Sequence, residues 1–228
     1  MGASDVQRTS DGRMPIDHLV YAVPNLEKAV QDFEARLGAP PRPGGRHEGL
    51  GTHNAILPLE GLVYVELIAI DPLQDSPGRP RPFGLDDLAQ PRLVTWAART
   101  VDIESVVALA RKRGFDPGTV LDLKRAPPSG ETISWKLTVR REPAGDGLVP
   151  FVIDWADATH PASGGPTPCR LESFSAQHPE PAVIEEALAA LDVALDVEHA
   201  AVPRLTAVVS GPGGRITLDS LAKPPQAS

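Results

Sequence analysis

The sequence has one cysteine, Cys169, in 228 residues, so it has no internal disulfide, and this composition is typical of a reducing compartment. It also lacks a basic excess, because 22 lysines and arginines against 30 aspartates and glutamates give a formal net charge of -8. Such a chain, without a basic stripe, is not expected to bind nucleic acid. No apolar run approaches the length of a membrane span, and the N-terminal residues contain no apolar stretch like that of a signal peptide. We therefore expect a cytoplasmic protein that binds neither nucleic acid nor membranes.

Aromatic residues are also scarce, at 4% of the chain, whereas 41% of the residues are hydrophobic. The core must therefore consist mainly of valine, leucine, isoleucine and alanine. The 20 glycines and 25 prolines fall between periodic segments. This placement indicates many turns between short elements rather than disorder.

The apolar run 16–23, with His18 in its middle, predicts a strand because it is short and rich in β-branched residues. Asn25 is a suitable N-cap for a helix over 26–37, which Gly38 ends. Two further strands are predicted at about 52–58 and 63–70, and there is room for another near 42–48. Residues 16–70 thus fit a strand–helix–strand–strand–strand unit, βαβββ.

The same order of elements recurs along the chain. The spacing from Asn25 to Gly38 is close to that from Asp102 to Gly114, which indicates an internal repeat. The second copy is predicted as a strand at 92–100, a helix at 103–113, and strands at about 118–124, 132–139 and 149–155. A weaker third copy is predicted as a strand at 169–176, a helix at 181–192, and strands at about 195–199, 204–210 and 214–218.

These units resemble a known family. The motifs that carry the resemblance are Ile16-Asp-His-Leu-Val-Tyr-Ala-Val, Gly44-Gly-Arg-His, Gly51-Thr-His-Asn, Val65-Glu-Leu-Ile-Ala and Pro150-Phe-Val-Ile-Asp-Trp. The chain is similar to the glyoxalase-like domain family of the vicinal oxygen chelate superfamily. The resemblance implies an α+β fold in which two βαβββ units, over 15–160, pair into a half-barrel cup for a small ligand.

A degenerate third unit, over 161–220, is expected to pack on the outside of the paired units or to pair with its copy in a homodimer. We predict a homodimer. Residues 1–14 and 221–228 are expected to be tails.

The resemblance implies a metal ligand at His18, in the first strand, and a carboxylate ligand at Glu66, in the last strand of the first unit. Imidazole and carboxylate are standard ligands for one divalent ion such as Zn, Fe, Mn or Ni. Glu66 lies in the apolar run 63–70, where a buried carboxylate needs a cation or hydrogen bonds. Two arrangements without a metal stay open. Either His18 and Glu66 hydrogen-bond to each other, or Glu66 lies on a solvated face.

Further ligands have to be sought elsewhere. Aligning the two N-caps puts Thr95, a poor ligand, opposite His18. Asp154 falls opposite Glu66 in one of two registers that differ by one residue, and such a shift reverses the face on which a side chain lies. His53 enters a strand and is a candidate both as a metal ligand and as a substrate contact.

Two arginines are candidates for substrate binding. Arg46, with the backbone N–H groups of the glycines around it, would hold an anionic or carbonyl oxygen. The same glycines also fit a tight loop without any ligand. Arg99 ends a strand and would either meet an anionic substrate or pair with Asp102. His47 and His160 are expected at the surface, and Trp135 and Trp155 in the core or at a sheet edge.

Two functions follow from the resemblance. In the first, the metal chelates a small substrate through adjacent oxygens, and the protein is a lyase, an isomerase or a ring-cleaving dioxygenase with an unassigned general base. In the second, the cup is a metal-free module that sequesters a small molecule, as resistance proteins of the superfamily do. The missing ligand in the second unit favours the second function, and the grouping of His18, His53 and Glu66 favours the first.

Overall fold

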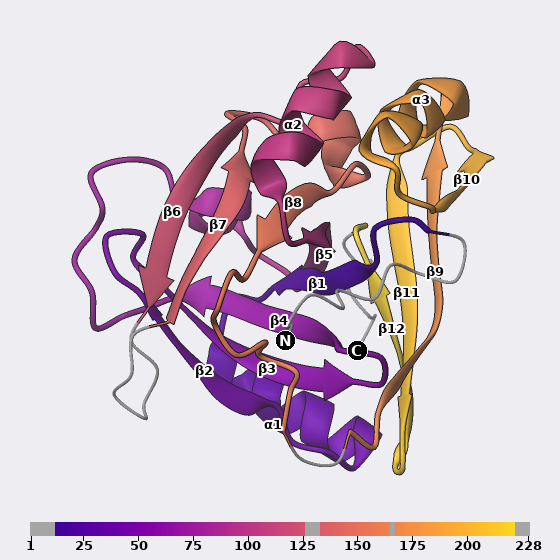
Figure 1. Cartoon of the computed structure of the whole chain (residues 1–228). Helices are drawn as coiled ribbons and strands as arrows, with labels where there is room; N and C mark the ends of the chain where they lie inside the picture. The colour runs from indigo at the N-terminus through magenta and orange to yellow at the C-terminus, as the bar shows by residue number, and fades with distance from the viewer. Residues whose placement is uncertain (1–11, 126–132, 165–166, 222–228) are drawn as a thin grey trace, which may run out of the picture.

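A computed structural model describes residues 12–125, 133–164 and 167–221. Within these residues the chain forms three α-helices and two β-sheets, an α+β architecture (Figure 1). The tails expected at 1–14 and 221–228 lie mostly outside the described residues. In the described part, no helix is both long enough and apolar enough to span a membrane.

The element order βαβββ occurs three times, as predicted. Unit one contains β1 (Ile16–Ala22), α1 (Leu26–Leu37), β2 (Arg42–His47), β3 (Thr52–Leu59) and β4 (Val63–Ile70). A crossover with the short 3-10 segment η1 (Pro82–Asp87) leads to unit two, which contains β5 (Arg92–Thr100), α2 (Ile103–Lys112), β6 (Thr119–Arg125), β7 (Ile133–Val139), η2 (Ala144–Gly147) and β8 (Phe151–Asp154). Unit three contains β9 (Arg170–His178), α3 (Pro181–Leu191), β10 (Asp196–His199), β11 (Arg204–Gly211) and β12 (Gly214–Asp219).

Units one and two share one curled sheet, sheet A, with the strand order β2-β3-β4-β1-β5-β8-β7-β6. In each unit the first strand pairs in parallel with the last, β1 with β4 and β5 with β8. The antiparallel pair β1–β5 joins the units in the middle of the sheet. This arrangement confirms the predicted half-barrel built from two repeats.

The repeated helices begin at the predicted caps. The Asn25 side chain accepts a hydrogen bond from the N–H of Lys28, and the Asp102 side chain accepts one from the N–H of Ser105. Each cap satisfies one backbone N–H that has no partner in the first turn of its helix. Gly38 ends α1 in the left-handed conformation, with φ of 70°, which suits glycine because it has no Cβ.

Unit three forms a separate four-stranded sheet, sheet B, with the order β10-β9-β11-β12. Here the first strand pairs in parallel with the strand directly after the helix, β10, and not with the last strand. Unit three therefore repeats the element order of the other units but not their strand pairing. It packs on units one and two through contacts of β12 with α1, of α3 with α2, and of β11 and β12 with β5 (Figure 1).

The two faces of sheet A have different partners. We call the face that contacts α1, α2 and sheet B the outer face, and the opposite face the inner face. The main core lies at the outer face, where aliphatic side chains of all three units meet. Trp96 of β5 is fully buried in this core, where it donates a hydrogen bond to the carbonyl of Leu148 and contacts the ring of Phe174.

Two segments pack on apolar side chains of the inner face. Leu85 of η1 is buried against Val20 and Ile68 at one end. At the other end, Ala162 and Trp155 of the segment 155–162, which follows β8, pack with side chains of β3, β4 and β7. The polar side chains described below therefore lie on a largely covered face.

The turn between β11 and β12 fits closely against the end of α1. Gly213 donates a backbone hydrogen bond to the carbonyl of Leu37 at 2.7 Å. A Cβ at Gly213 would lie 2.7 Å from the backbone nitrogen of Gly38, a distance that real Cβ contacts do not show. The strands expected at 204–210 and 214–218 imply this turn, but its contact with α1 requires the tertiary structure.

We expect Gly213→Ala to lower the free energy of unfolding by about 2 kcal/mol, because the methyl group meets backbone that cannot move aside. Urea unfolding measures the loss. Gly61→Ala is the control: its φ is +76° but a Cβ there meets no atom within 4 Å, so only backbone strain of about 1 kcal/mol is expected. A loss at Gly213 no larger than that at Gly61 would contradict the close fit.

Candidate functional site

His18 and Glu66 lie together on the inner face of sheet A. They are on the parallel neighbours β1 and β4, and their side chains are 4% and 11% exposed. The distance from His18 Nε2 to Glu66 Oε2 is 3.8 Å, which is too long for a hydrogen bond. The structure thus brings the predicted pair together, but without the direct hydrogen bond that was one alternative. It also buries Glu66, so the other alternative, a solvated face, is wrong.

His47 is the third member of this group. Its Nε2 lies 3.9 Å from Glu66 Oε1, and its Nδ1 is 2.9 Å from the hydroxyl of Thr52. The expectation that His47 lies at the surface is wrong, because it is only 8% exposed on β2. The pairing of His47 with Thr52 across β2 and β3 places both on the inner face, since directly opposed residues share a face.

Glu66 is held by a further contact. Asn54 of β3 donates a hydrogen bond from Nδ2 to Glu66 Oε1. Thus one buried carboxylate has two imidazole rings and one amide around it, from β1, β2 and β3.

Asp17 connects this group to unit two. Its Oδ1 lies 2.6 Å from His18 Nδ1, and its Oδ2 lies 3.0 Å from Trp155 Nε1, 2.9 Å from His160 Nε2 and 3.3 Å from an amino nitrogen of Arg99. Burial alone would raise the pKa of the Asp17 carboxyl, but the hydrogen bonds from His160 and His18 hold this pKa well below its ordinary value. Asp17 is therefore ionised although its side chain is completely buried. His160 is not at the surface as expected but binds this carboxylate.

His53 and Arg46 lie on the opposite face of the sheet. They are paired across β2 and β3, one residue out of step with the pair formed by His47 and Thr52. Arg46 is 3.3 Å from a carboxylate oxygen of Asp71. Burial, opposed by the nearby Asp71, lowers the pKa of His53. The structure therefore does not bring these two predicted residues to His18 and Glu66.

Asp154 is not brought to His18 and Glu66 either. Its carboxylate accepts hydrogen bonds from the backbone N–H groups of Ile103 and Ala156. Its neighbour Ile153 packs instead with Ile56 and Tyr64 on the inner face. Of the two registers considered from the sequence, the structure has the one that directs Asp154 away from the group.

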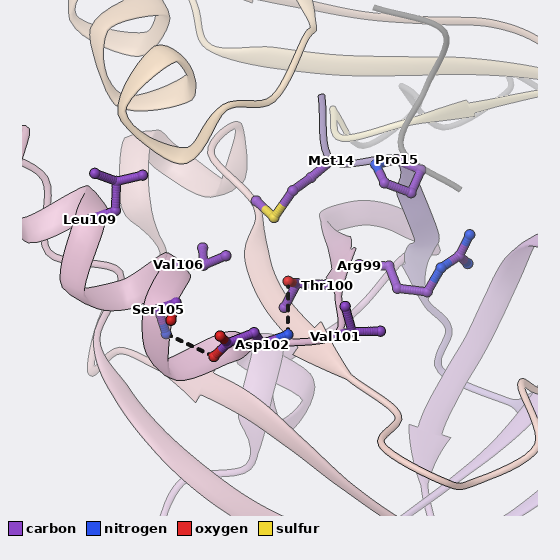
Figure 2. Close-up of a pocket in the computed structure, with 9 residues that line it drawn as sticks. All are labelled: Met14, Pro15, Arg99, Thr100, Val101, Asp102, Ser105, Val106 and Leu109. Carbon is purple, nitrogen blue, oxygen red and sulfur yellow. Dashed lines mark hydrogen bonds between the residues drawn. The ribbon is translucent and has the colours of Figure 1, made fainter. Parts of the chain in front are cut away.

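Arg99 binds Asp17, and it also donates a hydrogen bond to the carbonyl of Leu62. It contributes to the wall of a groove of about 250 Å³ near the start of α2 (Figure 2). Its guanidinium group points away from Asp102 there, and Asp102 caps the helix instead (Figure 2). The groove is lined by none of His18, His47 and Glu66.

Four aromatic side chains surround the polar group. Tyr64 stacks on His18 with ring centroids 4.6 Å apart, and Phe151 meets the same ring edge-on at 5.5 Å. Trp135 meets His47 edge-on at 6.4 Å and lies 5.5 Å from Trp155. Aromatic residues are rare in this chain, so their concentration on the inner face supplies an apolar wall beside the polar atoms.

The arrangement offers two imidazole nitrogens and one carboxylate from one half of the sheet. Among the described residues, no three histidine, cysteine or acidic side chains are already placed to hold a metal ion. Two ligands of one ion lie roughly 3.0–3.4 Å apart when each is about 2.1 Å from it. The N···O distances of 3.8 and 3.9 Å would each need to shorten by about 0.4–0.9 Å. His18, His47 and Glu66 thus offer the atom types that bind a divalent ion, and their side chains would have to move closer together to share one.

Comparisons with known proteins agree with the architecture. A family model described as a glyoxalase-like domain matches residues 16–191. A hypothetical protein from Staphylococcus aureus has a similar structure, with a TM-score of 0.61 at 13% identity over 90% of this chain and 84% of that one.

Methylmalonyl-CoA epimerases from Mycobacterium tuberculosis and Streptomyces coelicolor are less similar in structure, with TM-scores of 0.44 and 0.45 at 17% and 20% identity. Each covers 65% of this chain, and the match spans 93% and 99% of their own chains. A search of curated proteins gave no significant match. Likeness at these identities shows the fold alone, whereas the family model covers most of the chain. The chain belongs to the glyoxalase-like domain family.

Proposed function

We propose that the protein binds a small molecule at a divalent metal ion held by His18, His47 and Glu66 on the inner face of sheet A. One observation carries the proposal. Two imidazole rings on different strands present Nε2 to the two different oxygens of one buried carboxylate. The Nδ1 of each ring meets another protein group, Asp17 for His18 and Thr52 for His47. Metal-binding histidines are commonly oriented in this way by a partner at the second ring nitrogen.

The ligand types fit Zn, Fe, Mn or Ni, which accept imidazole and carboxylate. When bound, such an ion acts as a Lewis acid toward a substrate oxygen. The chain's own residues then have distinct tasks. Asn54 keeps one oxygen of Glu66 in place, and the rings of Tyr64 and Trp135 limit the access of water and offer an apolar contact to the substrate.

The substrate class we propose is a small molecule with adjacent oxygens, and the reaction a lyase, isomerase or dioxygenase reaction. Glu66 cannot readily be both a firm ligand and a free base, so the general base stays unassigned. Arg46, His53 and Asp154, which the sequence suggested for the site, have no part in this proposal because other contacts hold them elsewhere. The homodimer stays a prediction, and light scattering of the purified protein tests it.

A metal-free binding module is the second candidate. In the described part of unit two, no metal ligand faces His18 and Glu66, and Ile153 and aromatic rings lie there instead. This arrangement favours the metal-free module. In this case the same inner face binds an apolar small molecule, and the polar group orients it through hydrogen bonds.

Metal content separates the two candidates. We expect the wild-type protein, purified without chelator or affinity tag, to contain about one equivalent of a transition metal by mass spectrometry. The double variant His18→Ala, Glu66→Ala should contain none, because it loses two of the three ligands. His53→Ala is the matched control, since it removes a histidine of the same sheet from the opposite face, and it should keep the metal.

Absence of metal from the wild-type protein, both as purified and after incubation with each of the four ions, would contradict the metal site. So would retention of the metal by the folded double variant. Either result would leave the metal-free module as the better account.

Metal binding should also stabilise the fold, because an ion that binds only the folded state shifts the unfolding equilibrium. At a free metal concentration 100 times the dissociation constant, we expect a gain of about 2.7 kcal/mol. A thermal shift assay with chelator-treated protein measures it. The shift should be absent in His47→Ala, which lacks the ligand that sequence reasoning missed. An equal shift in His47→Ala and wild type would remove His47 from the site.

A further inference from the structure

We propose that Asp17 is a positioning residue of the metal site, which fixes the ring of His18 so that Nε2 faces Glu66. We further propose that unit two takes part in the site by holding Asp17 rather than by supplying a ligand. Both statements rest on the proposed function.

The contact between Asp17 and His18 determines which nitrogen of the ring is available. Trp155 and Arg99, which can only donate, hold Oδ2 of this carboxylate, so Asp17 acts as a hydrogen-bond acceptor. The 2.6 Å contact of Oδ1 then places a proton on His18 Nδ1. In the neutral ring, Nε2 then carries the lone pair, and this nitrogen faces Glu66 at 3.8 Å. Tyr64, stacked on the ring at an interplanar angle of 16°, restricts rotation out of this plane.

An irregularity in β1 allows the contact. Neighbouring residues in a regular strand point to opposite faces, so Asp17 and His18 would be separated. The pairing of β1 with β5 shifts register between Ile16 and His18. Such bulges re-aim a side chain and are common near functional sites. Here the irregularity lies at the point where the Asp17 carboxylate meets the ring of its neighbour.

Unit two holds the other oxygen of Asp17. Trp155 and His160 from the segment after β8, and Arg99 from β5, all contact Oδ2. His160 Nδ1 accepts a hydrogen bond from the N–H of Ala162, so the proton of its neutral ring lies on Nε2, which faces Asp17. Donors on Oδ2 leave Oδ1 directed at His18. The two units of the half-barrel are therefore joined through this carboxylate.

The Nδ1 atoms of the two histidines of the site have different partners. His47 Nδ1 meets the neutral hydroxyl of Thr52 at 2.9 Å, whereas His18 Nδ1 meets a charged, fully buried carboxylate at 2.6 Å. Hydrogen bonds to charged groups are roughly twice as strong as those between neutral groups. Replacement of the partner should therefore matter more for His18 than for His47.

The test compares two buried aspartates of the full-length protein. Co²⁺ is titrated into chelator-treated wild type, Asp17→Asn and Asp71→Asn. We expect Asp17→Asn to bind Co²⁺ about 10–100-fold more weakly, as is usual when the outer partner of a metal-binding histidine is lost. Asp71 is the matched control because it is 1% exposed and contacts Leu73 and Gln74 rather than the ligands. Its replacement should leave the affinity unchanged even where it lowers stability.

A second readout reports on the ring itself. Nitrogen NMR of the His18 side chain should show a proton on Nδ1 in the wild type and a mixture of tautomers in Asp17→Asn, which a purely structural role would not produce. Trp155→Phe removes one donor to Asp17 and leaves the Asp17 and His18 side chains themselves unchanged. It should weaken Co²⁺ binding about threefold, and it tests the proposal if Asp17→Asn does not fold.

Co²⁺ affinity of folded Asp17→Asn within twofold of wild type would overturn the inference while leaving the proposed function intact. The same holds for unchanged affinity in Trp155→Phe if Asp17→Asn does not fold. Failure of the wild type to bind Co²⁺ or any of the four proposed ions would overturn the proposed function. In that case the tautomer of His18 in the wild type still decides whether Asp17 positions this ring, and a proton on Nε2 would contradict it.

Discussion

A carboxylate removed from water is stable only when hydrogen bonds and opposite charge replace its solvation. Asp17 meets this condition with groups from β1, from β5 and from the segment after β8, which places both units of the half-barrel around one charge. The β1–β5 pair that joins the units passes through the same point. Formation of the site and formation of sheet A are therefore coupled, since neither unit alone completes the surroundings of Asp17.

The two faces of sheet A carry different kinds of side chain and have different roles. The outer face carries the aliphatic core and is covered by α1, α2 and unit three. The third unit therefore adds buried apolar area at the outer face rather than at the inner face. The inner face carries the charged and aromatic side chains. Within that face, unit one contributes the imidazoles and Glu66, and unit two contributes Trp135, Phe151 and the donors to Asp17. This asymmetry explains why a search for ligands at equivalent positions of both repeats finds them in only one.

Much of the fold could be predicted from the sequence because its signals are local. The caps Asn25 and Asp102 and the alternation of apolar residues define helices and strands within a few residues. His18 and Glu66 could be selected because each is a polar residue in an apolar run. Packing of unit three on the paired units was one of two expectations, but its contact surfaces could not be predicted, because the close fit of Gly213 on α1 depends on two segments far apart in the chain.

The rest of the site depends on the face of the strand to which each side chain points and on long-range contacts. His47 and His53 lie on paired strands, and a difference of one residue in register decides which of them faces Glu66. The sequence left room for a strand near 42–48, but its glycines also fitted a loop, and the pairing of His47 with Thr52 shows that the strand forms. The contact of Asp17 with His18 could not be predicted, because a regular strand would direct the two side chains to opposite faces. His160 reaches Asp17 from 143 positions further along the chain, and no local pattern reports such a contact.

The central claim is that two imidazoles and one carboxylate of unit one hold the same divalent ion. X-ray absorption spectroscopy of the Co²⁺-loaded wild-type protein tests it most directly, because multiple scattering from imidazole rings counts the histidine ligands. The account predicts two histidine nitrogens and carboxylate oxygen in the coordination sphere, at about 2.0–2.2 Å as in comparable sites. A spectrum with no histidine ligand, or with a single one, would contradict it.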